Sequence, residues 1–247
     1  MDSLPILSAT AGAFLAAGFV KGVIGVGLPT VAIGLLGLLM PPAQAAAILV
    51  VPSLVTNIWQ FAVGGDLLAL VRRMWPMLVG ICVGTFLGAM LLPRDAAGMA
   101  TVWLGIALAL YAALGLIKIQ FKVAPSAEIW LGLLMGAATG AITVATGVFV
   151  LPGMPYVQAM QFERDRLVQA LGLSFTVSTV TLAAALGYAG EMHASLAGPS
   201  LLALGAALVG MWLGQLLRGQ VAPETFRLWF FLGLMLLGVH LALRGVL

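Results

Sequence analysis

The chain has 247 residues, of which 62% are apolar and only 8% are charged, and its formal net charge is +3. Soluble domains carry about 25% charged residues, so this composition excludes a soluble globular protein and indicates an integral membrane protein. The 11 lysine and arginine residues are scattered at the ends of apolar runs, which argues against nucleic-acid binding. The single cysteine, Cys82, excludes an intramolecular disulfide and a multi-cysteine metal site.

Long apolar runs without period-2 alternation follow one another from end to end. Backbone inside a bilayer must satisfy its own hydrogen bonds, so these runs predict an all-α polytopic membrane protein, with one domain over residues 1–247. At about 20 residues per crossing, eight full-length spans are predicted: residues 3–21, 42–63, 74–92, 98–118, 128–146, 166–189, 196–217 and 226–244.

Two further apolar stretches, residues 28–40 and 148–160, are too short for a regular span. A helix of 13 residues covers only about 20 Å, so each stretch needs irregular backbone to complete a crossing. The glycine-containing and proline-containing positions 25–27 and 153–155 suit such breaks, which are tolerated where the backbone lines a cavity or is buried in protein.

The distribution of basic residues decides between two topologies. If both short stretches stay on one face, the basic residues divide five to six between the two sides and give no orientation. If both cross, nine share one side and only Arg94 and Arg244 lie on the other, as the positive-inside rule expects. The sequence therefore predicts ten membrane segments with both termini outside.

Short strings recur between the two halves of the chain. The pairs are VGTFLGAMLL at 83–92 with VGMWLGQLLR at 209–218, Trp103 with Trp229, Gly18 and Gly22 with Gly136 and Gly140, and PPAQA at 41–45 with PYVQA at 155–159. Their offsets are 126, 126, 118 and 114. Since five crossings per half is an odd number, we predict two inverted repeats, residues 1–122 and 123–247. Glycine and leucine richness alone is the alternative explanation of the matches.

AGFVKGVIGVG at 17–27 with prolines at 41 and 42, and GAATGAITVATG at 136–147, resemble the sulfite exporter TauE/SafE family of bacterial membrane proteins over nearly the whole chain. The resemblance implies a multi-pass transporter of the bacterial inner membrane that moves a small sulfur-containing or carboxylate anion, generally outward, with no cofactor. The commonest family form has three or more glycines before a proline. Val26 and Leu28 interrupt that run here, which leaves the particular anion open, as the oligomeric state is, with a homodimer as one candidate.

Helix breaks expose backbone N–H groups and positive dipole ends, which suit an anion. Gly25, Gly27 and Gly147 are therefore candidate substrate-binding positions, and we expect the two helix ends to approach one small oxyanion. The alternative is close helix packing through small residues four apart. Packing is the favoured interpretation for Gly84, Gly88, Gly210 and Gly214.

Polar side chains inside spans are costly and need a partner or a cavity. Asn57 and Gln60 share a helix face, and their amides can donate hydrogen bonds to sulfonate or carboxylate oxygens. The other polar candidates for substrate binding are Gln44, Thr143, Thr146, Gln158, Gln169, Ser174 and Ser178. Hydrogen bonding between helices, with no ligand role, is the alternative for each of them.

Lys21 is the one lysine beside a predicted helix break. It is a candidate binding residue as a cation at the cytoplasmic mouth that concentrates anions. The alternative is a flanking lysine that reaches back to the lipid headgroups.

The sequence leaves two other function classes as alternatives. A membrane-embedded enzyme needs a nucleophile with a base, a pair of aspartates or zinc ligands, and the sequence has no HExxH, no G-x-S-x-G and no aspartate pair within a predicted span. An anion channel is the second alternative, although the chain lacks rings of pore charges. We expect a transporter of a small anion, with no metal and no enzymatic activity.

Overall fold

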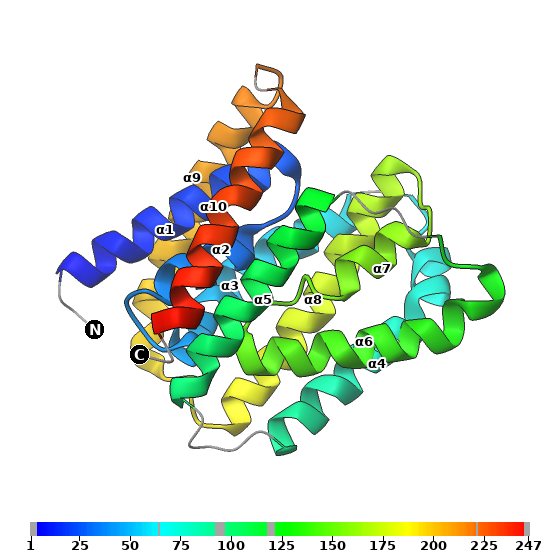
Figure 1. Cartoon of the computed structure of the whole chain (residues 1–247), viewed down its shortest axis with the longest axis horizontal. Coiled ribbons are helices and arrows are strands. Elements are labelled where there is room, and N and C mark those ends of the chain that lie inside the picture. Colours follow the sequence, from blue (N-terminus) through cyan, green and yellow to red (C-terminus); the bar gives the residue numbers. More distant parts are fainter. Residues whose placement is uncertain (1–3, 64, 92–96, 118–121, 221, 245–247) are drawn as a thin grey trace.

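The computed structural model describes the whole chain except residues 1–3, 64, 92–96, 118–121, 221 and 245–247. The described residues form helices and contain no strand, which confirms the all-α prediction. In chain order the helices are α1 (Leu4–Ile24), α2 (Leu28–Leu36), α3 (Pro42–Ala62), α4 (Leu67–Leu91), α5 (Ala97–Ile117), η1 (Pro125–Ala127), α6 (Glu128–Thr146), α7 (Gly153–Ala159), α8 (Arg164–Tyr188), η2 (Ala194–Leu196), α9 (Ala197–Leu217) and α10 (Pro223–Arg244) (Figure 1).

Eight helices of the described chain are long and apolar enough to cross a membrane, in the places where the eight full-length spans were predicted. One predicted boundary is wrong, because α4 begins at Leu67 and not near residue 74. Arginines are common just outside a membrane span, but Arg72 and Arg73 lie inside α4. The Arg73 guanidinium is held there by an ion pair with Glu128 at the start of α6, with Nη2 2.5 Å from Oε1.

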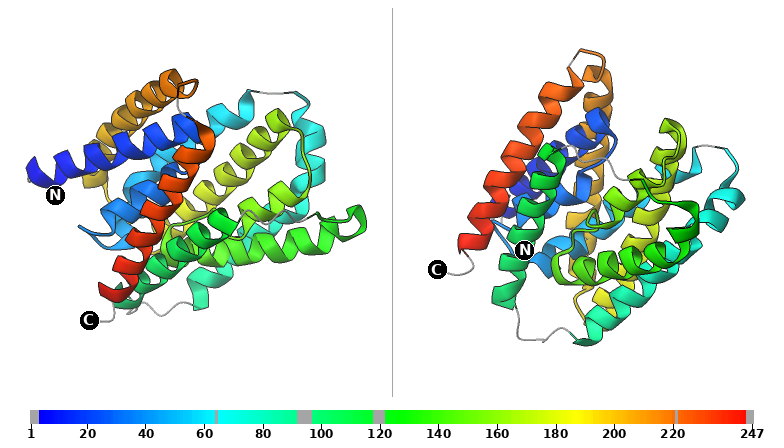
Figure 2. Two further views of the ribbon diagram at one scale, coloured as in Figure 1. Left: turned by 45° about the horizontal axis from the view of Figure 1, so that its top comes forward. Right: turned by 45° about the vertical axis from the view of Figure 1, so that its right-hand side comes forward.

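The helices pack as pairs around a central pair (Figures 1 and 2). α3 and α8 contact each other and are the most buried of the long helices, whereas α9 and α10 are the least buried. Around them α1 packs on α9, α4 on α6 and α5 on α10. Apolar side chains on the outer surface, such as Trp59 and Trp229, are exposed, as expected for side chains that face lipid.

Glycines allow the closest helix pairs to form. A Cβ atom added at Gly84 would overlap the backbone of Ala137 in α6, and one added at Gly210 would overlap the backbone of Leu15 in α1. A Cβ atom added at Gly214 would overlap the backbone of Phe19 in α1, and one added at Gly88 would overlap the side chain of Val144 in α6. These contacts agree with the packing interpretation of all four glycines.

The two short stretches are less helical than their apolar character indicates. α2 ends at Leu36, four residues before the end of the predicted stretch, and α7 begins only at Gly153. Residues 148–150 have no regular secondary structure, yet they are completely buried or nearly so. Pro152 precedes the first residue of α7 and has no backbone N–H to give to a preceding turn.

The first short stretch follows α10 along most of its length. The contacts are Gly27 with Phe230, Gly34 with Leu237, and the Leu38 carbonyl, which accepts a hydrogen bond from Arg244 Nη1 at 2.7 Å. Phe230 and Arg244 are 14 positions apart, about 21 Å along a helix. The stretch therefore runs along the part of α10 from Phe230 to its C-terminal end at Arg244.

The second short stretch runs back along α6. It leaves α6 at Gly147, passes Thr139 at Gly153, and reaches the start of α6 at Tyr156. The Tyr156 hydroxyl donates a hydrogen bond to the Glu128 carbonyl at 2.7 Å. Residues 155–159 thus lie inside this stretch, whereas residues 41–45 begin α3, so the matched strings PPAQA and PYVQA lie in a long and a short helix, respectively.

Candidate functional site

The amino group of Lys21 lies in the interior of the protein. Lys21 is only 5% exposed and is in the last turn of α1. Its Nζ donates hydrogen bonds to Thr56 Oγ1 at 3.0 Å and to Asn57 Oδ1 at 2.5 Å, both on α3. The flanking interpretation is therefore wrong, because the side chain turns towards α3 and not towards the headgroups.

A chain of hydrogen bonds leads from Lys21 across the central helix pair. Asn57 Nδ2 donates to Ser53 Oγ at 3.0 Å, and Ser53 Oγ lies 3.1 Å from Thr179 Oγ1 on α8. The Thr179 hydroxyl proton is directed to the Phe175 carbonyl at 2.7 Å, so Ser53 is the donor to Thr179. Every acceptor in this series of hydrogen bonds is an uncharged oxygen atom. We call Lys21, Ser53, Thr56, Asn57 and Thr179 the lysine centre.

Lys21 has no charged partner within the lysine centre. The Arg73–Glu128 pair is the one ion pair formed among the described residues, and it lies away from Lys21. A charged side chain within a membrane protein is normally paired or faces water, since leaving it unpaired is costly. Lysine has three N–H donors, and two of those on Lys21 are directed to Thr56 and Asn57. The third N–H of a protonated Lys21 therefore has no acceptor among the described atoms.

The first helix break lies one turn beyond Lys21. Gly25 and Gly27 have φ values of 83° and 104°, which glycine adopts without the strain that a side chain would cause. The Gly25 carbonyl accepts a hydrogen bond from Gln60 Nε2 at 2.8 Å, and Gly27 caps α2. Gln60 Oε1 is buried without a partner among the described atoms. The structure therefore brings together four of the predicted site residues: Lys21, Gly25, Asn57 and Gln60.

The second break lies elsewhere. Gly147 has a φ of 75° and ends α6, and a Cβ atom there would lie 3.3 Å from Ala46 near the start of α3. Ala46 and Gln60 are 14 positions apart on α3, about 21 Å along the helix. The two glycine breaks are thus near opposite ends of α3. The expectation that both helix ends approach one small oxyanion is not met.

The remaining threonine and serine candidates mostly bond to their own helices. Thr143 donates to the Thr139 carbonyl, Thr146 donates to the Ile142 carbonyl and accepts from Val148 N, and Ser174 donates to the Leu171 carbonyl. Ser178 is an exception, because its buried hydroxyl has no partner among the described atoms. Such bonds within a helix leave the hydroxyl oxygens as acceptors only.

Two glutamine candidates lie at the two ends of α3. Gln169 Nε2 donates to the carbonyls of Phe61 and Gly65, and its Oε1 accepts from Arg166, so it ties α8 to the end of α3. Gln44 is half-buried in the first turn of α3, at the end of that helix opposite Gln60.

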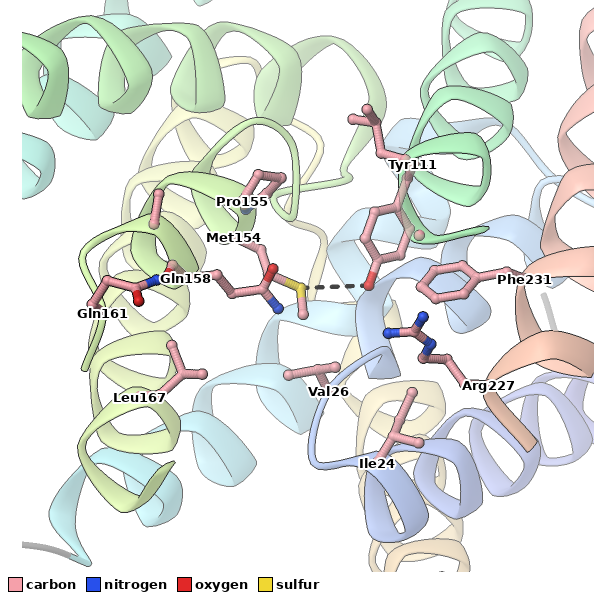
Figure 3. A pocket seen from close by; sticks show the side chains of 13 residues that line it. Ile24, Val26, Tyr111, Met154, Pro155, Gln158, Gln161, Leu167, Arg227 and Phe231 are labelled. Atoms are coloured by element: carbon pink, nitrogen blue, oxygen red, sulfur yellow. Dashed lines mark hydrogen bonds between the residues drawn. The ribbon is translucent and has the colours of Figure 1, made fainter. Parts of the chain in front are cut away.

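A cavity of about 560 Å³ opens beside the first break (Figure 3). α5, α7 and α10 enclose it together with the segment between α1 and α2. Three polar side chains, Tyr111, Gln158 and Arg227, point into it from three different helices (Figure 3). Its other lining residues are Ile24, Val26, Leu114, Gly115, Met154, Pro155, Ala159, Gln161, Leu167 and Phe231.

Of the cavity residues, the sequence analysis identified only Gln158. Arg227 has the spacing of a topology charge at the start of a span, and Tyr111 lies in an otherwise apolar run. A tyrosine inside a span is a signal that points to a polar partner or a cavity, and Tyr111 follows that rule.

The sulfite exporter TauE/SafE family model matches residues 10–241, nearly the whole chain. The chain belongs to the sulfite exporter TauE/SafE family. No curated protein and no solved structure gives a significant match. Membership agrees with the resemblance drawn from the glycine and proline motifs, and it makes this TauE/SafE protein a multi-pass membrane transporter. The lysine centre and the cavity are therefore candidates for the path of a transported anion.

Proposed function

We propose that this TauE/SafE protein is a carrier that moves a small sulfur-containing or organic anion out of the cell across the bacterial inner membrane. The observation that carries the proposal is the amino group of Lys21, which is buried within the membrane domain beside uncharged oxygens only. An anion that binds there supplies the missing negative charge. Export is the direction that the family description implies.

The lysine centre suits a small oxyanion. When it is protonated, Lys21 offers one N–H and a positive charge. Next to Thr179 on α8, the buried hydroxyl of Ser178 is a donor that no described atom accepts. Hydrogen bonds to a charged ligand are roughly twice as strong as those between neutral groups. Selectivity for a monoanion follows from the single lysine, since a dianion would leave one negative charge unpaired in the low-dielectric interior.

Ten membrane segments form part of the proposal. The contacts of residues 27–38 along α10, and of residues 147–156 along α6, support a complete crossing by each short stretch. The crossing topology also gives the nine-to-two division of basic residues, with both termini outside.

Two inverted halves, residues 1–122 and 123–247, are the arrangement that we infer. If α1–α5 correspond to α6–α10, the pair α1–α9 corresponds to α6–α4, and both pairs pack closely. Gly25 and Gly147 both end a long helix with a positive φ, and 122 residues separate them. Glycine contacts support the same offset. Gly84 and Gly210 are matched positions on α4 and α9, and the residues that they contact, Ala137 on α6 and Leu15 on α1, are 122 positions apart. This inferred offset differs by four residues, about one helical turn, from the offset of 118 that the sequence match of Gly18 and Gly22 gives.

Inverted halves provide a physical route for transport. Rocking of one bundle against the other exposes a site near the midplane to each side in turn. The offset of 122 makes Thr143 the counterpart of Lys21, so the two halves carry a cation and a neutral hydroxyl at equivalent places. We infer that the anion is held mainly by the first half.

Counterflow in proteoliposomes tests the proposal. Purified protein is first screened by thermal shift with sulfite, thiosulfate, taurine, sulfoacetate and short carboxylates, since a true ligand stabilises the folded state by mass action. We expect one or more of these anions to show saturable counterflow. Lys21→Gln should raise the apparent KM by about 10-fold to 100-fold, the loss expected for a hydrogen bond to a charged group.

Lys122→Gln is the matched control, because Lys122 is exposed and outside the helices. It should leave the KM unchanged. Flux that rises linearly without saturation or counterflow indicates a channel and contradicts the carrier. Wild-type kinetics in Lys21→Gln contradict the assignment of the lysine centre.

A further inference from the structure

The cavity beside the first break carries hydrogen-bond donors with no acceptor of their own. Arg227 makes no hydrogen bond or ion pair with any residue that the structure describes, and no aspartate or glutamate lines the cavity. The Tyr111 hydroxyl has only the Met154 sulfur at 3.5 Å, a weak acceptor, and the side chain of Gln158 bonds to no described residue. These three side chains point towards the same space (Figure 3).

We propose that this cavity is a second anion site, distinct from the lysine centre, which binds organic anions that combine a sulfonate or carboxylate head with a short apolar body. Arg227 provides the charge and a planar fork of N–H donors that matches the two oxygens of such a head. Tyr111 and Gln158 add an O–H and an amide N–H from two other helices. The site is selective for anions because Arg227, Tyr111 and Gln158 can all donate hydrogen bonds and no lining residue carries a negative charge.

The apolar part of the lining determines the class of ligand. Ile24, Met154 and Phe231 lie beside the three donors and offer carbon and sulfur surface rather than hydrogen bonds. The volume of about 560 Å³ falls within the range of about 300–1,000 Å³ that small-molecule sites occupy. An inorganic oxyanion such as sulfite would leave most of this apolar surface uncovered, whereas a short alkyl chain covers it.

The place of the cavity gives it a role in transport. Ile24 and Val26 line the cavity and flank Gly25, and Lys21 is one turn earlier on α1. The first break therefore separates the cavity from the lysine centre. The cavity is on the membrane side where α10 begins, so an anion binds there first and passes the break to reach Lys21. This role rests on the proposed function, whereas binding in the cavity does not.

A homologous series of ligands tests the site. Wild-type protein in phosphatidylcholine nanodiscs is titrated calorimetrically with methanesulfonate, ethanesulfonate, propanesulfonate and butanesulfonate, and with 1-butanol as the uncharged control. Affinity should rise about fourfold for each added methylene, the gain expected when a CH₂ group leaves water. 1-Butanol should not bind measurably.

Variants assign the binding to named residues. Arg227→Gln should weaken butanesulfonate binding at least about 10-fold, and Tyr111→Phe should weaken it severalfold. Arg218→Gln, at the exposed C-terminal end of α9, is the matched control and should bind as wild type does. If Arg227→Gln fails to fold, Arg227→Lys replaces it, with an intermediate loss expected because the fork geometry is removed and the charge is kept.

Three outcomes overturn the proposal. The first is an affinity that does not depend on the length of the alkyl chain of the sulfonate. The second is wild-type affinity in both Tyr111→Phe and the Arg227 variant. The third is loss of butanesulfonate binding when anionic phosphatidylglycerol replaces phosphatidylcholine. The last result assigns the cavity to a lipid headgroup. Lys21→Gln separates this proposal from the proposed function: it should impair counterflow and leave butanesulfonate binding intact. Binding without counterflow in the wild-type protein contradicts the carrier and leaves the cavity site standing.

Discussion

Replacing Asn57 by aspartate should give Lys21 a permanent counter-ion and so block binding of the transported anion. Asn57 Oδ1 lies 2.5 Å from Lys21 Nζ, and aspartate has nearly the same shape. At that separation two unit charges attract by about 7 kcal/mol with an effective dielectric constant of about 20. Desolvation of the new carboxylate offsets several kcal/mol of this attraction. The folded protein should therefore be at least as stable as wild type.

Transport should respond in the opposite direction. A substrate anion must displace a carboxylate that is already in place, so we expect the apparent KM for counterflow to rise at least about 100-fold, a change of about 2.7 kcal/mol. Thermal denaturation in detergent measures stability in parallel. In the double variant Lys21→Gln with Asn57→Asp the carboxylate has no partner, and stability should fall about 3–5 kcal/mol below the single variant. An unchanged KM in Asn57→Asp refutes the reasoning, and so does a double variant as stable as the single one.

Two further predictions concern helix packing and the central hydrogen bond. Gly84→Ala should lower the melting temperature by the equivalent of about 1–3 kcal/mol, because the added methyl group meets the Ala137 backbone. Gly205→Ala is the control and should cause no loss, because the space around Gly205 is open. Equal melting temperatures of the two variants contradict this packing. A double-mutant cycle of Ser53→Ala and Thr179→Val should give a coupling free energy of about 0.6 kcal/mol in unfolding measurements, a value typical of hydrogen bonds between membrane helices. Strictly additive effects of the two substitutions contradict the hydrogen bond.

Several features of the fold follow directly from the sequence. Uninterrupted apolar runs locate eight long helices, because a bilayer admits little else. The positive φ of Gly25 and Gly147 was also foreseeable, since glycine is the residue that ends a helix in the left-handed conformation at least cost. Both observations depend on local physical chemistry, which a single sequence contains.

The short stretches show where local reasoning ends. Residues 148–151 are uniformly apolar, so they carry neither a helical nor a strand period, and only the tertiary contacts decide that the backbone there is not helical. The start of α4 is another such case. Arg73 is inside the helix because its partners, Glu128 and the ring of Phe162, come from distant parts of the chain.

The candidate site was only partly predictable for the same reason. Asn57 and Gln60 are recognisable as costly amides in a span, and both lie near the first break. That Lys21 turns inward depends on oxygens of α3 that are 35 and 36 residues away in the chain. Arg227 and Tyr111 line the same cavity because α5 and α10 pack together.

Site-directed cysteine labelling tests the central claim, that each short stretch carries the chain across the bilayer and inverts the second half. In a Cys82→Ala background, Ile24→Cys and Pro41→Cys place single thiols on either side of α2. The account predicts that a membrane-impermeant maleimide, added to intact spheroplasts, labels position 41, and that position 24 reacts only after the membrane is opened. Labelling of both positions from the same compartment contradicts the account.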